Sequence, residues 1–297
     1  GAVSDALSPE AYGNLADCEY LISRLDIDPD IINHTPNVKF WQRWGAGFDH
    51  VDLKAWGERG IPIATCPGVN SGIVAELAIM LMLAGYRNLL QINRQLRAGH
   101  WPRTEYFGRS FMIKGKTVGV LGLGHIGKKV AALASAFGAN VIYYDIVRQP
   151  EQEEQFGYRF VDFDTLLKES DIFTIHCPLN EETRGMIGAA QFAKMKPTAM
   201  LINTARGPIV DEAALVDALT TGKIATAGLD TYEHEPLPKD HPLLTLDNVV
   251  ASAHAGGNTK DNDINMVNYV YHNIVAFDRG EPLNTPGDIV NGEYLKK

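Results

Sequence analysis

Short apolar runs alternate with amphipathic stretches along most of the chain. Near the N-terminus, the runs at 19–25 ("EYLISRL"), 38–44 ("VKFWQRW") and 61–66 ("IPIATC") predict strands. The stretch "DLKAWGERG" (52–60) predicts a helix that Gly60 closes. Alternation of this kind favours parallel β/α units.

A second set of β/α units begins at Lys114. Its predicted strands are short runs of mostly apolar residues at 117–123, 140–145, 158–161, 171–177, 199–204, 225–230 and 249–254. Helical patterns lie between most of these strands, although the third and fourth instead flank "DFDTLLKES" (162–170). Two long helices are predicted, one over 73–97 that ends at Gly99 and Pro102, and one near 260–280.

This order of elements predicts an α/β protein with two doubly wound parallel-sheet domains, one inserted within the other. We assign residues 1–92 to the first part of the outer domain, 93–272 to the inserted domain and 273–297 to the return into the outer domain. The two long helices would cross between the domains.

Composition narrows the possible partners and compartment. The chain has 297 residues, 45% hydrophobic and 21% charged, as in an ordinary globular protein. Its net charge of −9 gives no basic footprint, so we expect no nucleic-acid partner. There is no CxxC pairing, which favours a reducing compartment and small buried thiols at the three cysteines, Cys18, Cys66 and Cys177.

Neither a targeting segment nor a membrane span is predicted. The opening "GAVSDALSPEAYG" lacks a basic start followed by an apolar run, so we expect no signal peptide. The most apolar stretch, residues 73–86, carries Glu76 and is shorter than the ~20 residues that a span needs. We therefore expect a cytoplasmic protein with no membrane partner.

The segment "VLGLGHIGKK" places Gly122, Gly124 and Gly127 in GxGxxG spacing between a predicted strand and a predicted helix. Such glycines allow a tight turn, close approach to a pyrophosphate and close helix packing. Since the chain holds 28 glycines, the spacing alone could mark a plain turn. The next strand, however, ends at Asp145, where a carboxylate would accept hydrogen bonds from a ribose. We predict NAD rather than NADP, because Asp145 would repel a 2′-phosphate, although Arg148 lies nearby.

Three later strands each lead into a charged residue. Arg206 follows the strand at 199–204, Asp230 and Glu235 follow the next, and His254 ends the last. Parallel strands would bring these residues to one sheet edge, which also receives the dinucleotide. A His–carboxylate pair can exchange the proton of an alcohol–ketone pair, and an Arg can hold a carboxylate and polarise a carbonyl. With a nicotinamide, this set predicts reversible reduction of a 2-keto acid.

Simpler interpretations of these residues remain open. Any one of nine histidines is more often a surface or core residue than a catalyst. Arg206 could form a structural ion pair with Asp211 or Glu212. His234 with Glu235, and Asp240 with His241, could suggest a metal, but no HExxH-type spacing supports one, so we predict none.

At this point the chain resembles the D-isomer-specific 2-hydroxyacid dehydrogenases, of the phosphoglycerate or glyoxylate/hydroxypyruvate reductase type. Several segments in the family's order carry the resemblance: "WGAGFDHVDL", "CPGVNSGIVAELAIMLML", "GKTVGVLGLGHIGKKVA", "HCPLNEETRGMIG", "LINTARGPIVDEAAL", "AGLDTYEHEPLP" and "SAHAGGNT". It implies a Rossmann NAD-binding domain inserted into a flavodoxin-like substrate domain, and a homodimer joined through the cofactor domain.

The resemblance also implies roles for individual residues. Arg206, Glu235 and His254 would be catalytic, with Arg206 also binding substrate. Backbone N–H groups of Gly45, Ala46 and Gly47 would meet the substrate carboxylate. Besides the glycines of the loop, the implied cofactor contacts are His125, Ile126, Asp145, Cys177, Thr204, Ala205, Asp230 and Gly256.

The sequence departs from the family in a few places. The family has a further strand and helix before the segment that matches "ADCEYLISR" (16–24). Trp44 and Cys66 are bulkier or less usual at their positions, and Arg24 aligns with a position that meets substrate in some members.

The resulting hypothesis is NAD-dependent reduction of a small 2-keto acid, such as glyoxylate or hydroxypyruvate, to a D-2-hydroxy acid. The alternatives are a phosphoglycerate dehydrogenase-type activity and a dinucleotide-sensing, corepressor-like binding protein. L-specific lactate and malate dehydrogenases are disfavoured, because their glycine loop lies near the N-terminus and Gly122 lies mid-chain.

Overall fold

The computed structural model describes residues 15–24 and 29–295. Residues 1–13, where we expect no signal peptide, lie outside this part, as does Leu25 of the first predicted strand. The chain divides into two compact units: unit 1 is Gly1–Asn70 with Asn258–Lys297, and unit 2 is Ser71–Gly257. One domain is therefore inserted within the other, as predicted.

Unit 1 contains a three-stranded parallel sheet in the order β1-β2-β3. Its elements are β1 (Tyr20–Ser23), β2 (Phe40–Arg43), α2 (Leu53–Glu58), β3 (Ile63–Ala64) and α10 (Lys260–Arg279), with 3-10 helices at Pro29–His34 and Gly292–Tyr294. The Asp52 side chain begins α2 by accepting a hydrogen bond from Ala55 N at 2.9 Å. Buried Trp41 and Trp56 pack against each other in its core.

Unit 2 is a seven-stranded parallel sheet in the order β10-β9-β8-β7-β4-β5-β6. Its strands are β4 (Thr117–Leu121), β5 (Asn140–Tyr144), β6 (Arg159–Phe160), β7 (Ile172–Ile175), β8 (Met200–Asn203), β9 (Thr226–Leu229) and β10 (Val249–Ala251). The strand order changes direction beside β4, so β4 and β7 flank the switch point at which open α/β sheets bind ligands.

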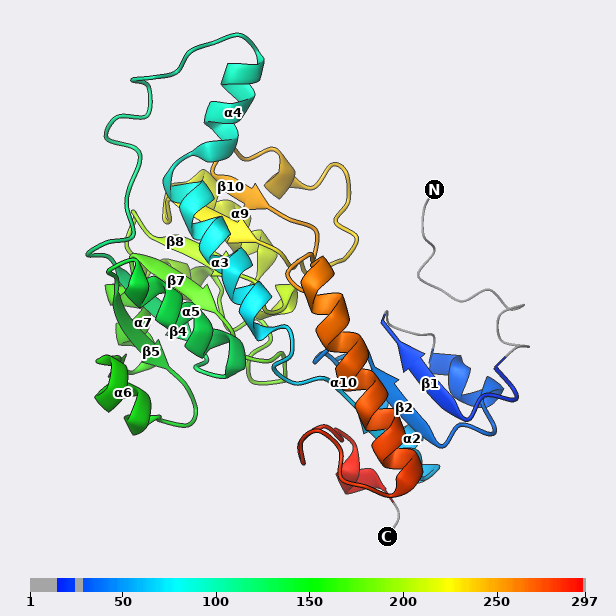
Figure 1. The fold of residues 1–297 in the computed structure, drawn as a ribbon. Coiled ribbons are helices and arrows are strands. Elements are labelled where there is room, and N and C mark those ends of the chain that lie inside the picture. The colour runs from blue at the N-terminus through cyan, green and yellow to red at the C-terminus, as the bar shows by residue number, and fades with distance from the viewer. Residues whose placement is uncertain (1–14, 25–28, 296–297) are drawn as a thin grey trace. The chain divides into compact units, whose positions relative to one another are not determined.

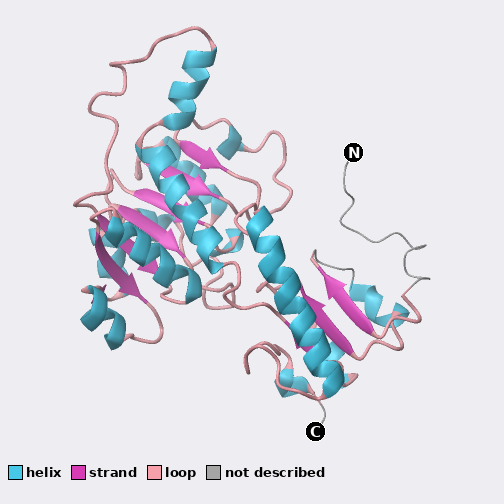
Figure 2. Ribbon diagram, in the orientation of Figure 1, coloured by secondary structure: helices cyan, strands magenta, loops and turns pink. Residues whose placement is uncertain are grey.

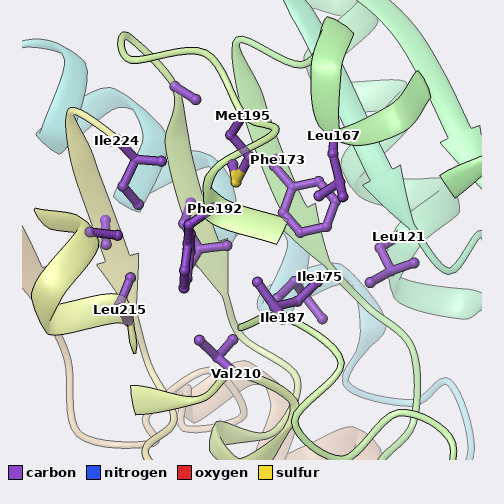
Figure 3. Close-up of a cluster of buried hydrophobic side chains, with 14 of the residues drawn as sticks. Leu121, Leu167, Phe173, Ile175, Ile187, Phe192, Met195, Val210, Leu215 and Ile224 are labelled. Atoms are coloured by element: carbon purple, nitrogen blue, oxygen red, sulfur yellow. The ribbon is translucent and has the colours of Figure 1, made fainter. Parts of the chain in front are cut away.

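Helices cover both faces of this sheet, and Figure 2 shows the strands between them. The helices are α3 (Ser71–Tyr86), α4 (Leu89–Arg97), α5 (His125–Ala136), α6 (Pro150–Phe156), α7 (Phe163–Glu169), α8 (Ala189–Phe192) and α9 (Glu212–Thr220), with 3-10 helices at Gly207–Ile209 and Pro242–Leu244. On one face α3 and α5 lie side by side (Figure 1) and share a core. The core of the other face includes Leu167, Phe192 and Leu215 (Figure 3).

The buried sheet explains why its strands were predictable. Every residue of β7 and of β8 is buried, because a parallel sheet covered on both faces needs apolar side chains in both directions. All ten predicted strands are present, each somewhat shorter than its apolar run. The segment 162–170 holds a helix, α7, which Asp162 caps by accepting from Thr165 N at 2.9 Å.

The prediction of one long helix over 73–97 is wrong, because two helices, α3 and α4, occupy this region. Asn88 lies between them in the left-handed conformation, with φ of 51°, and the two helices meet at 63°. The Asn88 amide donates to Arg109 O at 3.3 Å and to Ser110 Oγ at 3.2 Å. Asparagine tolerates positive φ, and these contacts from a distant loop hold the break.

The domain boundaries also differ from those predicted at 92/93 and 272/273. Helix α3 packs on α5, β8 and β9 and so belongs entirely to unit 2, whereas α10 packs on β2 and belongs to unit 1. No single helix in the described ranges has the length and apolar character to cross a membrane; only α3 and α4 counted together pass that test, and they are bent.

Candidate active site

The glycine loop joins β4 to α5 and is shaped by close contacts that only glycine permits. Gly122 has φ of +89°, and a Cβ there would lie 2.7 Å from Cys177 N. A Cβ on Gly127 would lie 2.0 Å from Gly122 O, so glycine lets α5 pack on the loop. Gly124 is the N-cap of α5 and has open space where a Cβ would stand. The first turn of α5 can therefore present backbone N–H groups to a pyrophosphate.

Asp145 lies just beyond β5, and its carboxylate is fixed against this loop. It accepts from Leu123 N at 2.7 Å and from Val147 N at 3.1 Å. Carboxylate oxygens have further lone pairs, so Asp145 can still accept from ribose hydroxyls. This geometry permits the cofactor contact predicted for Asp145, which stays a prediction.

The carboxyl ends of the next strands hold a second group of residues that the sequence predicts to contact the cofactor. Thr204 is buried, and its Oγ1 has no hydrogen-bond partner among the described residues. A buried hydroxyl without a partner is costly, and a bound ligand could satisfy it. Burial raises the pKa of the Cys177 thiol to about 11, so this side chain is neutral. The loop, Asp145 and Thr204 together fit a dinucleotide.

Arg206 lies two residues beyond the buried residue Thr204, in extended conformation and half-buried. Its Nη1 donates to Ala205 O at 2.8 Å, and its carbonyl accepts from Asn203 Nδ2 at 2.9 Å. Gly207 follows, where a Cβ would lie 1.8 Å from the backbone carbon of Tyr232. The loops after β8 and β9 therefore touch, and glycine is required at their contact.

Glu235 and His254 form the central contact of the site. The strands that lead to them are neighbours, with Asn203, Leu229 and Ala251 in register across β8, β9 and β10. His254 Nδ1 lies 2.6 Å from Glu235 Oε2. Glu235 Oε1 accepts from Tyr232 N at 2.9 Å, which fixes the carboxylate. His254 Nε2 is then the ring nitrogen that can exchange a proton with a substrate.

The electrostatics of this pair favour an imidazolium beside a carboxylate. The hydrogen bond to Glu235 raises the pKa of His254, and it outweighs the opposing effects of burial and of the Arg206 charge. Burial acts to raise the pKa of Glu235, but hydrogen bonds from His254 and from Tyr232 N prevail and lower it. The Arg206 charge also lowers the Glu235 pKa, which reflects its proximity to the pair. The structure thus brings Arg206, Glu235 and His254 together.

Asp230 has a further task beyond the predicted cofactor contact. It is 1% exposed and accepts from Ser252 Oγ at 2.5 Å, Ala255 N at 2.8 Å and Gly256 N at 2.9 Å. His254 has a positive φ of 49°, an unusual conformation for a residue other than glycine, and its N–H donates to Asp230 O at 2.8 Å. Asp230 therefore holds the loop that presents His254. Sequence reasoning did not identify the Ser252 hydroxyl, although Ser252 lies two residues before His254.

A second Glu–His contact was also missed. Glu212, in the first turn of α9, lies 3.0 Å from His241 Nε2 and accepts from Glu233 N at 3.1 Å. Asp211 caps α9 by accepting from Ala214 N at 2.9 Å. Asp211 and Glu212, the two possible ion-pair partners of Arg206 in the sequence, therefore make other contacts. The sequence shows Glu212 as an acidic residue at the start of a predicted helix, but this position does not indicate which residue it contacts.

The predicted substrate loop, Gly45, Ala46 and Gly47, belongs to unit 1. Cys66 N donates to Gly45 O at 2.8 Å, and Arg43 Nε donates to Gly47 O at 3.3 Å. Arg24, also in unit 1, donates to Asn258 Oδ1 at 2.7 Å. Within the described ranges no cluster of three or more His, Cys, Asp or Glu side chains could hold a metal ion.

Comparisons with known proteins point to one family. Residues 79–256 match the family model of the D-isomer specific 2-hydroxyacid dehydrogenase NAD-binding domain. The chain belongs to this family. Its cofactor domain is accordingly an NAD-binding Rossmann domain.

Individual relatives differ in the function that their names carry. The chain is 43% identical to D-3-phosphoglycerate dehydrogenase of Archaeoglobus fulgidus over 88% of its own length, but it spans only about half, 49%, of that protein. It is 39% identical to glyoxylate reductase of Korarchaeum cryptofilum, over 94% of the chain and 85% of the relative. NAD-dependent formate dehydrogenase from Staphylococcus aureus, solved in complex with NAD, shares 31% identity, with a TM-score of 0.86 and coverage of 97% and 87%.

Proposed function

We propose that the protein catalyses NAD-dependent, reversible reduction of a small 2-keto acid, such as glyoxylate or hydroxypyruvate, to a D-2-hydroxy acid. The observation that carries this proposal is the 2.6 Å contact between His254 Nδ1 and Glu235, beside Arg206 at the edge of the NAD-binding sheet. Family membership supports it independently.

In this proposal NAD supplies hydride chemistry at the substrate C2, and the chain's residues handle the proton and the charge. Protonated His254 would give its Nε2 proton to the oxygen that develops negative charge during reduction. Glu235 keeps the imidazolium in one orientation and raises its pKa. In the reverse direction, neutral His254 would take the hydroxyl proton.

Arg206 would hold the substrate carboxylate and polarise the keto oxygen. A guanidinium can offer paired N–H donors to a carboxylate, and the half-buried position strengthens its field. The carboxylate contact that the family resemblance implies for the backbone N–H groups of Gly45, Ala46 and Gly47, in unit 1, stays a prediction.

Arg206→Ala tests this assignment. We expect kcat/KM for glyoxylate to fall by about 10²–10³-fold, because a charged donor to the developing oxyanion is lost, while NADH affinity stays near the wild-type value. Arg103→Ala, at an exposed position of the same unit, is the matched control. Equal activity of the Arg206 variant and the control would contradict the assignment.

A phosphoglycerate dehydrogenase activity is the second candidate, and the 43% identity to a relative of that name favours it. A panel of 2-keto acids, with and without a 3-phosphate, assayed with NADH separates the two candidates. Higher kcat/KM for the phosphorylated substrate would favour the second.

We also propose that two copies associate through unit 2, as the family resemblance suggests. Large apolar side chains are exposed on and beyond helices α3 and α4, namely Met80, Leu89, Leu90, Leu96, Trp101, Phe107 and Met112. Apolar surface of this kind marks association sites. Sedimentation of the full chain should report a dimer, and a monomer at all concentrations would contradict this proposal.

A further inference from the structure

Arg148, a cation close in sequence to the predicted ribose site, is held by other groups in unit 2. Arg148 lies in the short loop after β5, three residues beyond Asp145. The loop is tied to the glycine loop on both sides of Arg148, since Asp145 accepts from Leu123 N at 2.7 Å and Gln149 Nε2 donates to Leu123 O at 2.9 Å. Arg148 therefore lies where an arginine could meet a 2′-phosphate.

The Arg148 guanidinium is nevertheless bound in a bidentate manner by Glu153 on α6. Nε donates to Oε1 at 2.8 Å and Nη2 donates to Oε2 at 2.7 Å. The same guanidinium lies 5.7 Å from the centre of the Phe160 ring on β6. A bidentate pair over an aromatic ring is the geometry in which arginine is most firmly oriented.

Glu153 is itself anchored, so the pair differs from an ordinary surface ion pair. Tyr143, a buried residue of β5, donates its hydroxyl to Glu153 Oε1 at 2.9 Å and accepts from Gln149 N at 2.8 Å. The Glu153 side chain is 19% exposed, against 61% for Arg148. Hydrogen bonds from Arg148 lower the pKa of Glu153 to about 2, so the carboxylate is ionised at any physiological pH.

We propose that Glu153 determines cofactor selectivity: by holding the Arg148 guanidinium against α6 and β6, it denies a 2′-phosphate its counter-ion and favours NAD over NADP. Asp145 repels the phosphate, and Glu153 holds back the Arg148 charge that could offset that repulsion. This inference deepens the proposed function, because it concerns the choice of dinucleotide at the same site.

Direct binding tests it without relying on turnover. Titration of Glu153→Gln with NADH and with NADPH, followed by cofactor fluorescence, should show the NADPH/NADH affinity ratio raised by about tenfold, the scale of one charged hydrogen bond regained. The amide oxygen of the new side chain can still accept from Tyr143, so the fold should persist. Glu154→Gln, which removes the same charge from an exposed position of the same helix, is the matched control.

The double variant Glu153→Gln/Arg148→Gln identifies the group responsible. The gain in NADPH affinity should disappear in it, because the freed guanidinium is gone. An unchanged ratio in Glu153→Gln, an equal gain in Glu154→Gln, or a gain that survives removal of Arg148 would each overturn the proposal. If wild type and the variants bound NADH normally in these cases, the proposed function would stand. If neither NADH nor NADPH bound wild type or the variants, the proposed function and the proposal for Glu153 would both be overturned.

Discussion

The segment from Asp230 to Leu244 takes part in two Glu–His contacts that have different surroundings. In one, Glu235 of the segment meets His254 at 2.6 Å, with the His and Glu side chains 51% and 33% exposed. In the other, His241 of the segment meets Glu212 at 3.0 Å, with side chains 21% and 11% exposed. The residue types are the same, so chemistry alone does not distinguish a catalytic pair from one that holds a loop.

Position explains the difference between the two contacts. His254 follows β10 at the carboxyl edge of the sheet, near Arg206, and its pKa is raised by a carboxylate that is fixed but accessible. Glu212 instead ties the start of α9 to the backbone of the segment through Glu233 N. We infer that the first pair moves protons and that the second keeps the Glu235 loop in place.

The largest effect should come from His254→Asn. Loss of the acid–base group should lower kcat by about 10²–10⁴-fold. The contact is half-exposed, so the free energy of unfolding should fall by no more than ~1 kcal/mol. Steady-state kinetics and urea denaturation on the same preparation measure both quantities. A large loss of stability with retained turnover would reverse the roles of the two pairs.

His241→Asn should show the opposite pattern. It leaves the nearly buried Glu212 carboxylate without its side-chain partner, which should reduce the free energy of unfolding by about 1–3 kcal/mol. Turnover should change little once the variant is folded, and Glu212→Gln/His241→Asn should recover part of the lost stability. If kcat in His241→Asn fell as far as in His254→Asn, the distinction between the pairs would be lost.

Ser252→Ala should give the smallest effect. Asp230 would lose one of its donors but would keep the N–H groups of Ala255 and Gly256. We expect a loss of about 1 kcal/mol in stability and a modest fall in kcat with KM for NADH unchanged. Ser252→Thr, which retains the hydroxyl, should restore kcat, and failure to do so would argue against a positioning role.

The strands and the grouping of the candidate catalytic residues were predictable for a physical reason. The run at 199–204 is apolar because β8 is buried on both faces, and the charged residues were recognisable because each follows such a run. The break at Asn88 could not be predicted, since hydrogen bonds to Arg109 and Ser110 from a distant loop hold it. Those partners become neighbours only in the folded chain.

The structural contacts around the site could not be predicted from the sequence for the same reason. From the sequence, Asp211 and Glu212 are possible partners of Arg206, and Asp240 and His241 are possible metal ligands, because spacing alone does not show which side chains meet. Folding instead joins Glu212 to His241 and makes Asp211 a helix cap. Likewise, the sequence shows that Arg148 lies near Asp145, but it does not show that the Arg148 guanidinium is bound by Glu153.

The pH dependence of glyoxylate reduction in wild type and Glu235→Gln tests the central claim most directly. In the proposed mechanism reduction needs protonated His254, so kcat/KM with NADH should be constant at low pH and fall as pH rises through the His254 pKa. Because Glu235 raises that pKa, the fall should move to lower pH in Glu235→Gln. A profile that keeps its position, or that moves to higher pH, would contradict the assignment of Glu235 and His254 as the acid–base pair.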